Sequence, residues 1–147
     1  MFSNAKPGEI VAVVGKISPQ TVSNSATVYS DVVDLSKYTA VQAIALFGDM
    51  ANETIDFKCY TCDSDGSNPS ALSGYAMTQL AGSASANDNK GAIINLLSDG
   101  LIASGKQYVK FGLVTGGGTG GSCAMVVQGL FPRFAPVSHI AAIVQNV

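Results

Sequence analysis

Short apolar runs, each followed closely by turn-forming residues, are the feature that most restricts how this chain can fold. The runs are rich in Val, Ile, Phe and Tyr, whereas signals for helices are few. Such spacing is typical of many short strands joined by turns. We therefore expect about eight strands in a single all-β domain, a β-sandwich or a jelly roll.

Three segments carry this pattern most clearly. Thr54–Thr61 alternates, which places Ile55, Phe57 and Cys59 on one face of a strand. Gln107–Val114 alternates in the same way, and Val41–Phe47 is apolar on both faces, as a central strand is. The other expected strands are Glu9–Ile17, closed by Pro19, then Thr21–Tyr29, Tyr75–Leu80, Cys123–Phe131 with Met125, Val127 and Phe131 on one face, and Ile140–Val147.

Two interpretations fit the segment Gly91–Leu101. Ile93, Leu97 and Leu101 lie near helical spacing, whereas Ile94 and Leu96 fit a strand. Periodicity alone does not decide so short an apolar run. We favour the strand and keep the helix as the alternative.

The chain of 147 residues has a length that suits one compact domain. Pro7 and Gly8 interrupt the N-terminal apolar run, so we expect residues 1–20 to form an extended arm and the first strand. Residues 21–147 would then form the β-sandwich domain. No internal repeat and no domain linker is visible in the sequence.

Charge is scarce: Asp, Glu, Lys and Arg make up 12% of the residues, against a usual value of about 25%. The surface is therefore either rich in neutral polar groups or covered in an assembly, and we favour the assembly because interface cores are depleted in charge. The lysines are scattered without a basic patch, which argues against nucleic acid as a partner.

No apolar stretch approaches the roughly 18 residues of a membrane span, and the N-terminus does not resemble a signal peptide. We therefore expect no membrane partner and synthesis in the cytoplasm of the producing cell. The three cysteines are then expected to be reduced.

Candidate chemical motifs are weak. Cys59 and Cys62 form a CxxC, but a zinc site needs more ligands, and residues three apart on a strand point to opposite faces. Gly116, Gly118 and Gly121 fit GxGxxG, but the following residues predict a strand rather than the helix that a dinucleotide site requires. We expect the two cysteines to be small apolar core residues and the glycines to form a flexible loop between neighbouring strands.

The segment Asp63–Asn68 resembles the start of a calcium loop without its bidentate Glu. A turn held by Asp and Asn side chains is the expected structure, with weak cation binding as the alternative. His139 is the only histidine, and nothing in the sequence pairs it with a nucleophile. We expect no enzyme, no catalytic residue, no cofactor and no metal site.

Several stretches, in order, resemble tailed-bacteriophage capsid decoration (cement) proteins: KPGEIVAV, VDLSKYTAVQAIALFGDM, TIDFKCYTCDSDGS, NDNKGAIINLLSDGL, GKQYVKFGLVTG and QGLFPRFAPVSH. They cover most of the chain, and the family has no active site to carry over. The resemblance implies a virion structural protein, made in the host cytoplasm, that sits on the capsid exterior and bridges major capsid protein subunits. A homo-oligomer is expected, and a trimer would suit a capsid three-fold axis.

The expected interface combines the arm, with Phe2 as an apolar anchor, and the C-terminal run from Ile140, which could add a strand to a neighbouring sheet. Alternatives are a tail or head–tail joining subunit of similar fold and a carbohydrate-binding β-sandwich module. The module would need an aromatic platform, and the chain has no Trp. The candidate interface residues are Phe2, Lys6, Pro7, Arg133, Phe134, Ile140, Ile143 and Val144.

Overall fold

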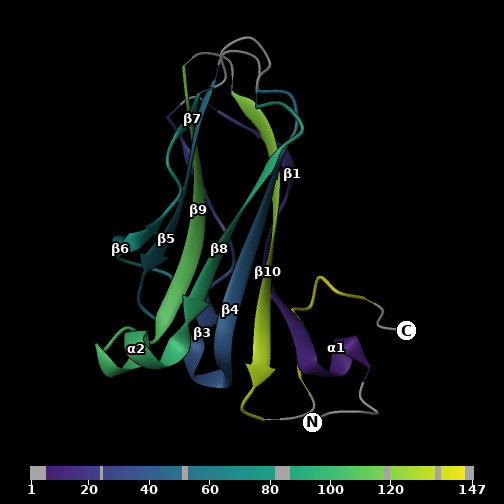
Figure 1. Ribbon diagram of the computed structural model, residues 1–147, viewed down its shortest axis with the longest axis vertical. Helices are drawn as coiled ribbons and strands as arrows, with labels where there is room; N and C mark the ends of the chain where they lie inside the picture. Colours follow the sequence, from purple (N-terminus) through teal and green to yellow (C-terminus); the bar gives the residue numbers. More distant parts are fainter. Residues whose placement is uncertain are drawn as a thin grey trace.

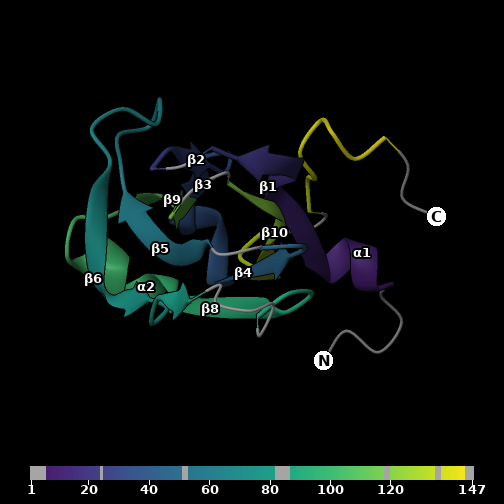
Figure 2. The same ribbon diagram turned by 90° about the horizontal axis from the view of Figure 1, so that it is seen from above.

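Two antiparallel sheets face each other in the computed structural model, which describes residues 6–23, 25–50, 53–81, 87–117, 120–134 and 137–144 (Figures 1 and 2). The four-stranded sheet runs in the order β1 (Val11–Val22), β10 (Gly121–Pro132), β4 (Tyr38–Phe47) and β8 (Gly91–Leu97). The six-stranded sheet runs β2 (Thr27–Tyr29), β9 (Tyr108–Gly116), β5 (Thr54–Thr61) and β6 (Ser70–Ala76), with β3 (Val33–Asp34) paired to β9 and β7 (Leu80–Ala81) paired to β5.

Helices are short and lie at one end of the sandwich (Figure 1). They are α1 (Pro7–Ile10), the 3-10 turn η1 (Leu35–Lys37) and α2 (Ser98–Ala103). When the two-residue strands β3 and β7 are set aside, each sheet has four antiparallel strands, and successive strands of the chain cross repeatedly from one sheet to the other. This is the double-sheet arrangement of a jelly roll, which confirms the predicted fold class.

The core lies between the two sheets. Strand β5 turns Ile55, Phe57 and Cys59 inward, each with no exposed surface, as the alternation predicts. Phe111 of β9 packs on Phe57, with 6.3 Å between ring centroids. Opposite them, β10 contributes Met125 and Val127. Apolar side chains from both sheets therefore close one continuous interior.

One glycine makes room for a ring in this packing. Gly129 of β10 lies against Tyr38 of β4, and a Cβ atom at position 129 would stand 2.5 Å from the Tyr38 ring. No methyl group fits at that distance. The absence of a side chain at Gly129 thus lets the Tyr38 ring bury to 6% exposure.

Strand boundaries differ from the prediction at both ends of β1. The residues Pro7–Ile10 form a helical turn, so the strand begins at Val11 rather than Glu9. It also continues through Pro19 to Val22, with a register shift between Ile17 and Gln20. An edge strand tolerates proline at such an irregularity, because the missing N–H removes no central hydrogen bond.

Other predictions are corrected in the C-terminal half. Gly91–Leu101 is a strand only to Leu97 and then turns into α2, so each interpretation holds for part of the segment. Phe131 has a positive φ of 50° and points outward with 67% exposure, instead of joining Met125 and Val127 inside. Residues 140–144 form no strand, and residues 145–147 lie outside the described residues.

The predicted extended arm is also altered where the structure describes it. Lys6 is extended, but Pro7 begins the helical turn α1, whose Glu9 side chain accepts a hydrogen bond from the Lys6 amide at 3.0 Å. Phe2 lies outside the described residues. Strand β1 pairs along its length with β10, so residues 11–20 are an integral part of the sandwich.

Candidate interaction surface

The outer face of the four-stranded sheet is built of side chains that alternate with the core residues. Strand register places these side chains in rows that run across the sheet. One apolar row joins Leu97, Ala40, Leu130 and Val11, and a second joins Ile93, Ile44 and Val126 and ends at Lys16 on the β1 edge. Leu46 and Ala124 extend the apolar surface beyond the second row.

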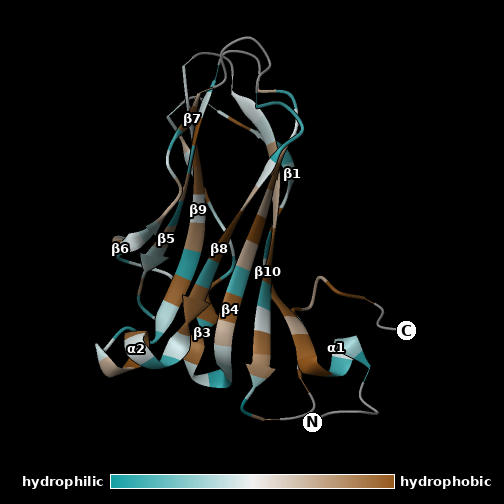
Figure 3. Cartoon of the chain, viewed as in Figure 1, coloured by the Kyte–Doolittle hydropathy of each residue, from teal (hydrophilic) through white to brown (hydrophobic). Residues whose placement is uncertain are grey.

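A row of amides separates the two apolar rows. Asn95, Gln42 and Gln128 are register partners across β8, β4 and β10. The Gln42 Nε2 donates a hydrogen bond to Asn95 Oδ1 at 2.8 Å. Figure 3 shows this hydrophilic band at one level of the three strands, with hydrophobic segments above and below it.

Several side chains of this face are large, apolar and open to solvent. Leu97 is 71% exposed, Leu46 60%, Ile93 56% and Val126 42%. No Asp, Glu, Lys or Arg is among the outward residues of β8, β4 and β10. We call this surface, made by the outward residues of these three strands with Val11 and Val13 of β1, the sheet face.

The outer surface of the six-stranded sheet differs in character. Asp56 and Lys58 of β5 form an ion pair at 3.4 Å, and Gln79 donates a hydrogen bond to Asp56. The Lys110 ammonium lies 4.0 Å from the centroid of the Tyr29 ring. The few charged residues are therefore unevenly distributed, and none of them is among the outward residues of β8, β4 and β10 on the sheet face.

Tyr29 and Tyr60 meet edge to face on this second surface, with ring centroids 5.2 Å apart over Gly112. A carbohydrate-binding platform offers a flat, open ring face for stacking. Here Lys110 covers one face of Tyr29, and the two rings stand at 85° to each other. This geometry does not favour the carbohydrate-binding alternative.

His139 fastens the C-terminal segment to the free edge of β1. The Val13 amide donates to His139 Nδ1 at 3.0 Å, and the Ile140 amide donates to the Val13 carbonyl oxygen at 2.9 Å. His139 Nε2 lies 3.1 Å from the Gly8 carbonyl oxygen. Because Nδ1 accepts from an N–H, Nε2 carries the proton and donates to Gly8. Ile140 thus pairs within its own chain.

Four further exposed apolar side chains lie where β1 begins and β10 ends, the end of the sandwich that also carries α1 (Figure 1). They are Phe131 at 67%, Phe134 at 77%, Ile143 at 37% and Val144 at 94% exposure, and we call them the terminal apolar set. A shallow hollow of about 430 Å³ brings Pro7 and Ile143, two of the predicted interface residues, together with Val11, Val13 and Gln128. It connects the terminal apolar set to the sheet face.

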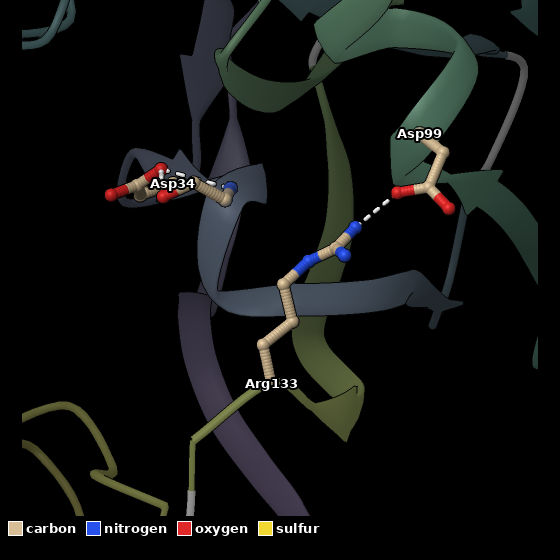
Figure 4. Close-up of polar contacts among 4 residues, drawn as sticks. Asp34, Asp99 and Arg133 are labelled. Carbon is tan, nitrogen blue, oxygen red and sulfur yellow. Dashed lines mark hydrogen bonds and ion pairs between the residues drawn. The ribbon is translucent and has the colours of Figure 1, made fainter.

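Arg133, another predicted interface residue, is engaged within the chain. Its guanidinium forms an ion pair with Asp99 of α2 (Figure 4). Its amide donates to the Lys37 carbonyl oxygen. Asp34, nearby, accepts hydrogen bonds from Ser36 and Gln107. Burial raises the pKa of Asp34, but these hydrogen bonds outweigh that effect and lower the pKa below its ordinary value. These contacts hold α2 and η1 at one end of the sandwich.

The cysteines are held as thiols in unreactive surroundings. Burial raises the pKa of Cys59 to about 12 and that of Cys123 to about 11. Burial also raises the pKa of Cys62, which is partly exposed. Cys59 faces the core, whereas Cys62 follows the end of β5, and both are free. A thiol nucleophile needs the opposite shift.

The segment Asp63–Asn68 is a turn held closed by hydrogen bonds of its own side chains and by the Lys110 ammonium. Asp63 Oδ2 accepts from Ser67 and Asn68, and Asp65 accepts from the Ser67 amide. The Lys110 Nζ donates to the Gly66 carbonyl. In the described part of the chain, no three His, Cys, Asp or Glu side chains are grouped so that they could hold a metal ion.

Gly116 ends β9 and Gly121 begins β10, so the glycine-rich stretch joins two strands that lie in different sheets. Gly118 lies outside the described residues. As predicted, a strand follows these glycines instead of the helix that a dinucleotide site needs. Within the described ranges, no helix has the length and apolar character needed to cross a membrane.

Comparison with protein-family models and with curated proteins gives no match. Among solved structures, the chain is similar to a protein of the disulfide-linked pili of Bacillus endospore appendages, with 10% identity, 87% of this chain and 96% of that chain covered, and a TM-score of 0.44. It is also similar to xylanase 10C of Cellvibrio japonicus, at 12% identity and TM-score 0.38, over 86% of this chain and 28% of the enzyme.

A third similarity is to VP2 of the infectious bursal disease virus subviral particle, at 11% identity and TM-score 0.26, over 84% of this chain and 41% of VP2. Two of the three proteins thus come from assembled structures, a pilus and a viral particle. With TM-scores below 0.5, these similarities carry no argument about function.

Sequence analysis did not select the sheet face. Leu46, Ile93, Leu97 and Val126 were absent from its candidate interface residues, as was the amide row. The sequence feature that could have indicated this surface was the apolar character of Val41–Phe47 on both faces. That feature was interpreted as a central strand, buried on both sides. In the structure, one of those faces is turned to solvent.

Proposed function

We propose that this chain is a structural subunit that decorates the capsid of a tailed bacteriophage, contacting both the shell and its own neighbours. The observation that carries the proposal is the division of the exposed large apolar side chains into two sets. One set lies on the sheet face, and the other is the terminal apolar set. Contiguous exposed apolar surface marks interaction sites, and a subunit that bridges a shell needs two of them.

The terminal apolar set suits contact with the major capsid protein. It includes three of the candidate interface residues from the sequence, Phe134, Ile143 and Val144, and it lies beside α1 and the start of β1. Phe134 and Val144 expose most of their surface, so burial against a shell would stabilise the complex at roughly 25 cal/mol per Å².

Sedimentation with shells tests the proposal. Shells assembled from the major capsid protein of the phage whose genome encodes this chain should carry the purified chain down at a saturating, fixed stoichiometry. Bound shells should also withstand heat or low salt better than bare shells. Absence of co-sedimentation with expanded shells would refute the proposal.

Two variants sharpen this experiment. Phe134→Asp places a charge in the terminal apolar set and should weaken shell binding at least tenfold, whereas Ser73→Asp on the exposed part of β6 should leave binding unchanged. Antibody labelling of intact virions then locates the subunit. Label confined to the tail would favour the tail or head–tail joining alternative.

A further inference from the structure

We propose that the sheet face is the contact between two copies of this chain, packed face to face about a two-fold axis with amide row against amide row. This goes beyond the proposed function, because it concerns the purified chain with no shell present.

On the sheet face, the amide row lies between two apolar rows, and this order makes the surface complementary to a second copy of itself. The amide row Asn95, Gln42 and Gln128 lies between an apolar row that includes Leu97 and one that includes Ile93. A two-fold axis lying along the amide row sets that row against its own copy. The same rotation sets each apolar row against the other apolar row, so no apolar side chain faces an amide.

Amides are suited to such a contact because each one both donates and accepts hydrogen bonds. Gln42 gives its Nε2 to Asn95 within the chain, and its Oε1 is an acceptor that a facing amide N–H can use. A facing row of carboxylates or of ammonium groups would repel its copy. A row of amides meets its own image with donors and acceptors on both sides.

The charge distribution also favours a second copy over an oppositely charged partner. The outward residues of β8, β4 and β10 offer no charge for such a partner to match. Lys16 lies at the β1 edge of the second apolar row, so the axis keeps both Lys16 residues at the β1 edge and places each at the end of the other copy's first apolar row. Four residues separate the two apolar rows, which puts the two Lys16 backbone positions about 13 Å apart, beyond the screening length of roughly 8 Å at physiological salt.

The area is sufficient for a stable pair. Four strands at about 4.8 Å spacing give a width of about 19 Å, and the ten residues of β4 give a length of about 33 Å. The face thus covers about 600 Å² on each copy. Two copies would bury about 1,200 Å², at the lower end of the range for specific protein–protein interfaces.

Pairing through the β1 edge is disfavoured. The Val13 amide and carbonyl are occupied by His139 and Ile140, and the Lys16 amide donates to Asp31 at 3.0 Å. These are groups that an added strand would need. The groups of β1 around Val13 and Lys16 are therefore not open to an added strand of another copy.

Analytical ultracentrifugation of the purified chain tests the proposal. The chain, of 15.0 kDa, should sediment as a dimer at micromolar concentration. Ile93→Asp, at a position that is 56% exposed, should raise the dimer dissociation constant at least tenfold without changing the unfolding midpoint of the monomer. Ser73→Asp on β6 is the matched control and should dimerise as the unmodified chain does.

A second variant tests the two-fold arrangement itself. Gln128→Glu should weaken the dimer at pH 7, because symmetry brings two carboxylates into the facing amide rows, and dimerisation should recover below about pH 4, where glutamate is protonated. A monomer at 100 µM, a trimer, or a dimer that both variants leave intact would overturn the proposal. Because no shell is present, each of these outcomes leaves the shell-binding result to stand by itself.

Discussion

The Nζ atom of Lys110 donates a hydrogen bond to the carbonyl oxygen of Gly66 at 2.7 Å, while its ammonium lies over the Tyr29 ring. Lys110 belongs to β9 and is only 8% exposed. Its buried hydrogen bond therefore anchors the 63–68 turn to the six-stranded sheet. A single lysine thereby orders a segment whose sequence resembles an ion-binding loop.

Replacing this lysine should destabilise the protein. Lys110→Met keeps the apolar stem and removes the donor, and we expect a loss of about 1–3 kcal/mol in the free energy of unfolding, as for buried hydrogen bonds to charged groups. Urea denaturation followed by circular dichroism measures it. Lys106→Met, at an exposed position, should change the free energy of unfolding by less than about 0.5 kcal/mol. Equal effects would contradict the anchoring role.

Calcium should leave the stability of the unmodified chain unchanged. A bound ion stabilises the folded state by RT ln(1 + [L]/Kd), so a real site would raise the melting temperature as calcium is added. The Lys110 ammonium already binds the Gly66 carbonyl, and neighbouring Ser67 and Asn68 satisfy Asp63. A thermal scan with and without millimolar calcium checks this, and a rising midpoint would restore the cation-site interpretation.

Two glycine substitutions should act in opposite directions. Gly129→Ala forces a Cβ to within 2.5 Å of the Tyr38 ring and should destabilise the protein by about 1–3 kcal/mol. Gly100→Ala in α2 meets no atom within 4 Å and should stabilise by about 0.5–1 kcal/mol, because alanine loses less entropy in a helix. Chemical denaturation of both variants gives the comparison. A neutral Gly129→Ala would show that the ring moves freely.

Thiol labelling should separate the three cysteines. Burial raises the pKa of each thiol, so at pH 8 each carries less thiolate than free cysteine and reacts more slowly. Partly exposed Cys62 should react first, and Cys59 and Cys123 only after denaturant is added. Mass spectrometry after timed labelling measures the order. The fast phase should disappear in Cys62→Ser and would persist there if Cys59 or Cys123 were the reactive thiol.

The His139 contact predicts a local change in backbone protection. His139→Ala removes the acceptor of the Val13 amide, so that amide should exchange its hydrogen about fivefold faster, as expected for the loss of a hydrogen bond of about 1 kcal/mol. His139→Asn retains an acceptor oxygen and should exchange more slowly than the alanine variant. Hydrogen exchange measured by NMR resolves this amide. Unchanged exchange in both variants would show that His139 does not hold the edge.

The fold was predictable from sequence where one local pattern determines the structure. Alternation placed β5 at Thr54–Thr61 and turned Phe57 inward, because a strand with one buried face has a strict period of two. The sequence pattern gave wrong strand boundaries and side-chain directions where these depend on the position of the strand in the folded sheet. Pro19 does not end β1, since an edge strand tolerates it, and the positive φ of Phe131 turns that side chain outward.

The candidate surface was less predictable than the fold. Ile93, Ile44 and Val126 come from segments far apart in the chain, and only the order β10-β4-β8 makes them one row. A run that is apolar on both faces looks the same whether its second face meets a helix, another sheet or another molecule. Val144 was easier to predict, because it belongs to an apolar run near the C-terminus that is visible without knowledge of strand order.

The C-terminal segment that covers the β1 edge has a consequence for how far assembly can proceed. An open strand edge is a template that adds one copy after another, and each added copy presents the same edge again, so that growth ends in fibres. In this chain, His139 and Ile140 occupy the groups of Val13 that such growth would use. At this point of the β1 edge, the protein is protected from open-ended polymerisation by its own C-terminal segment.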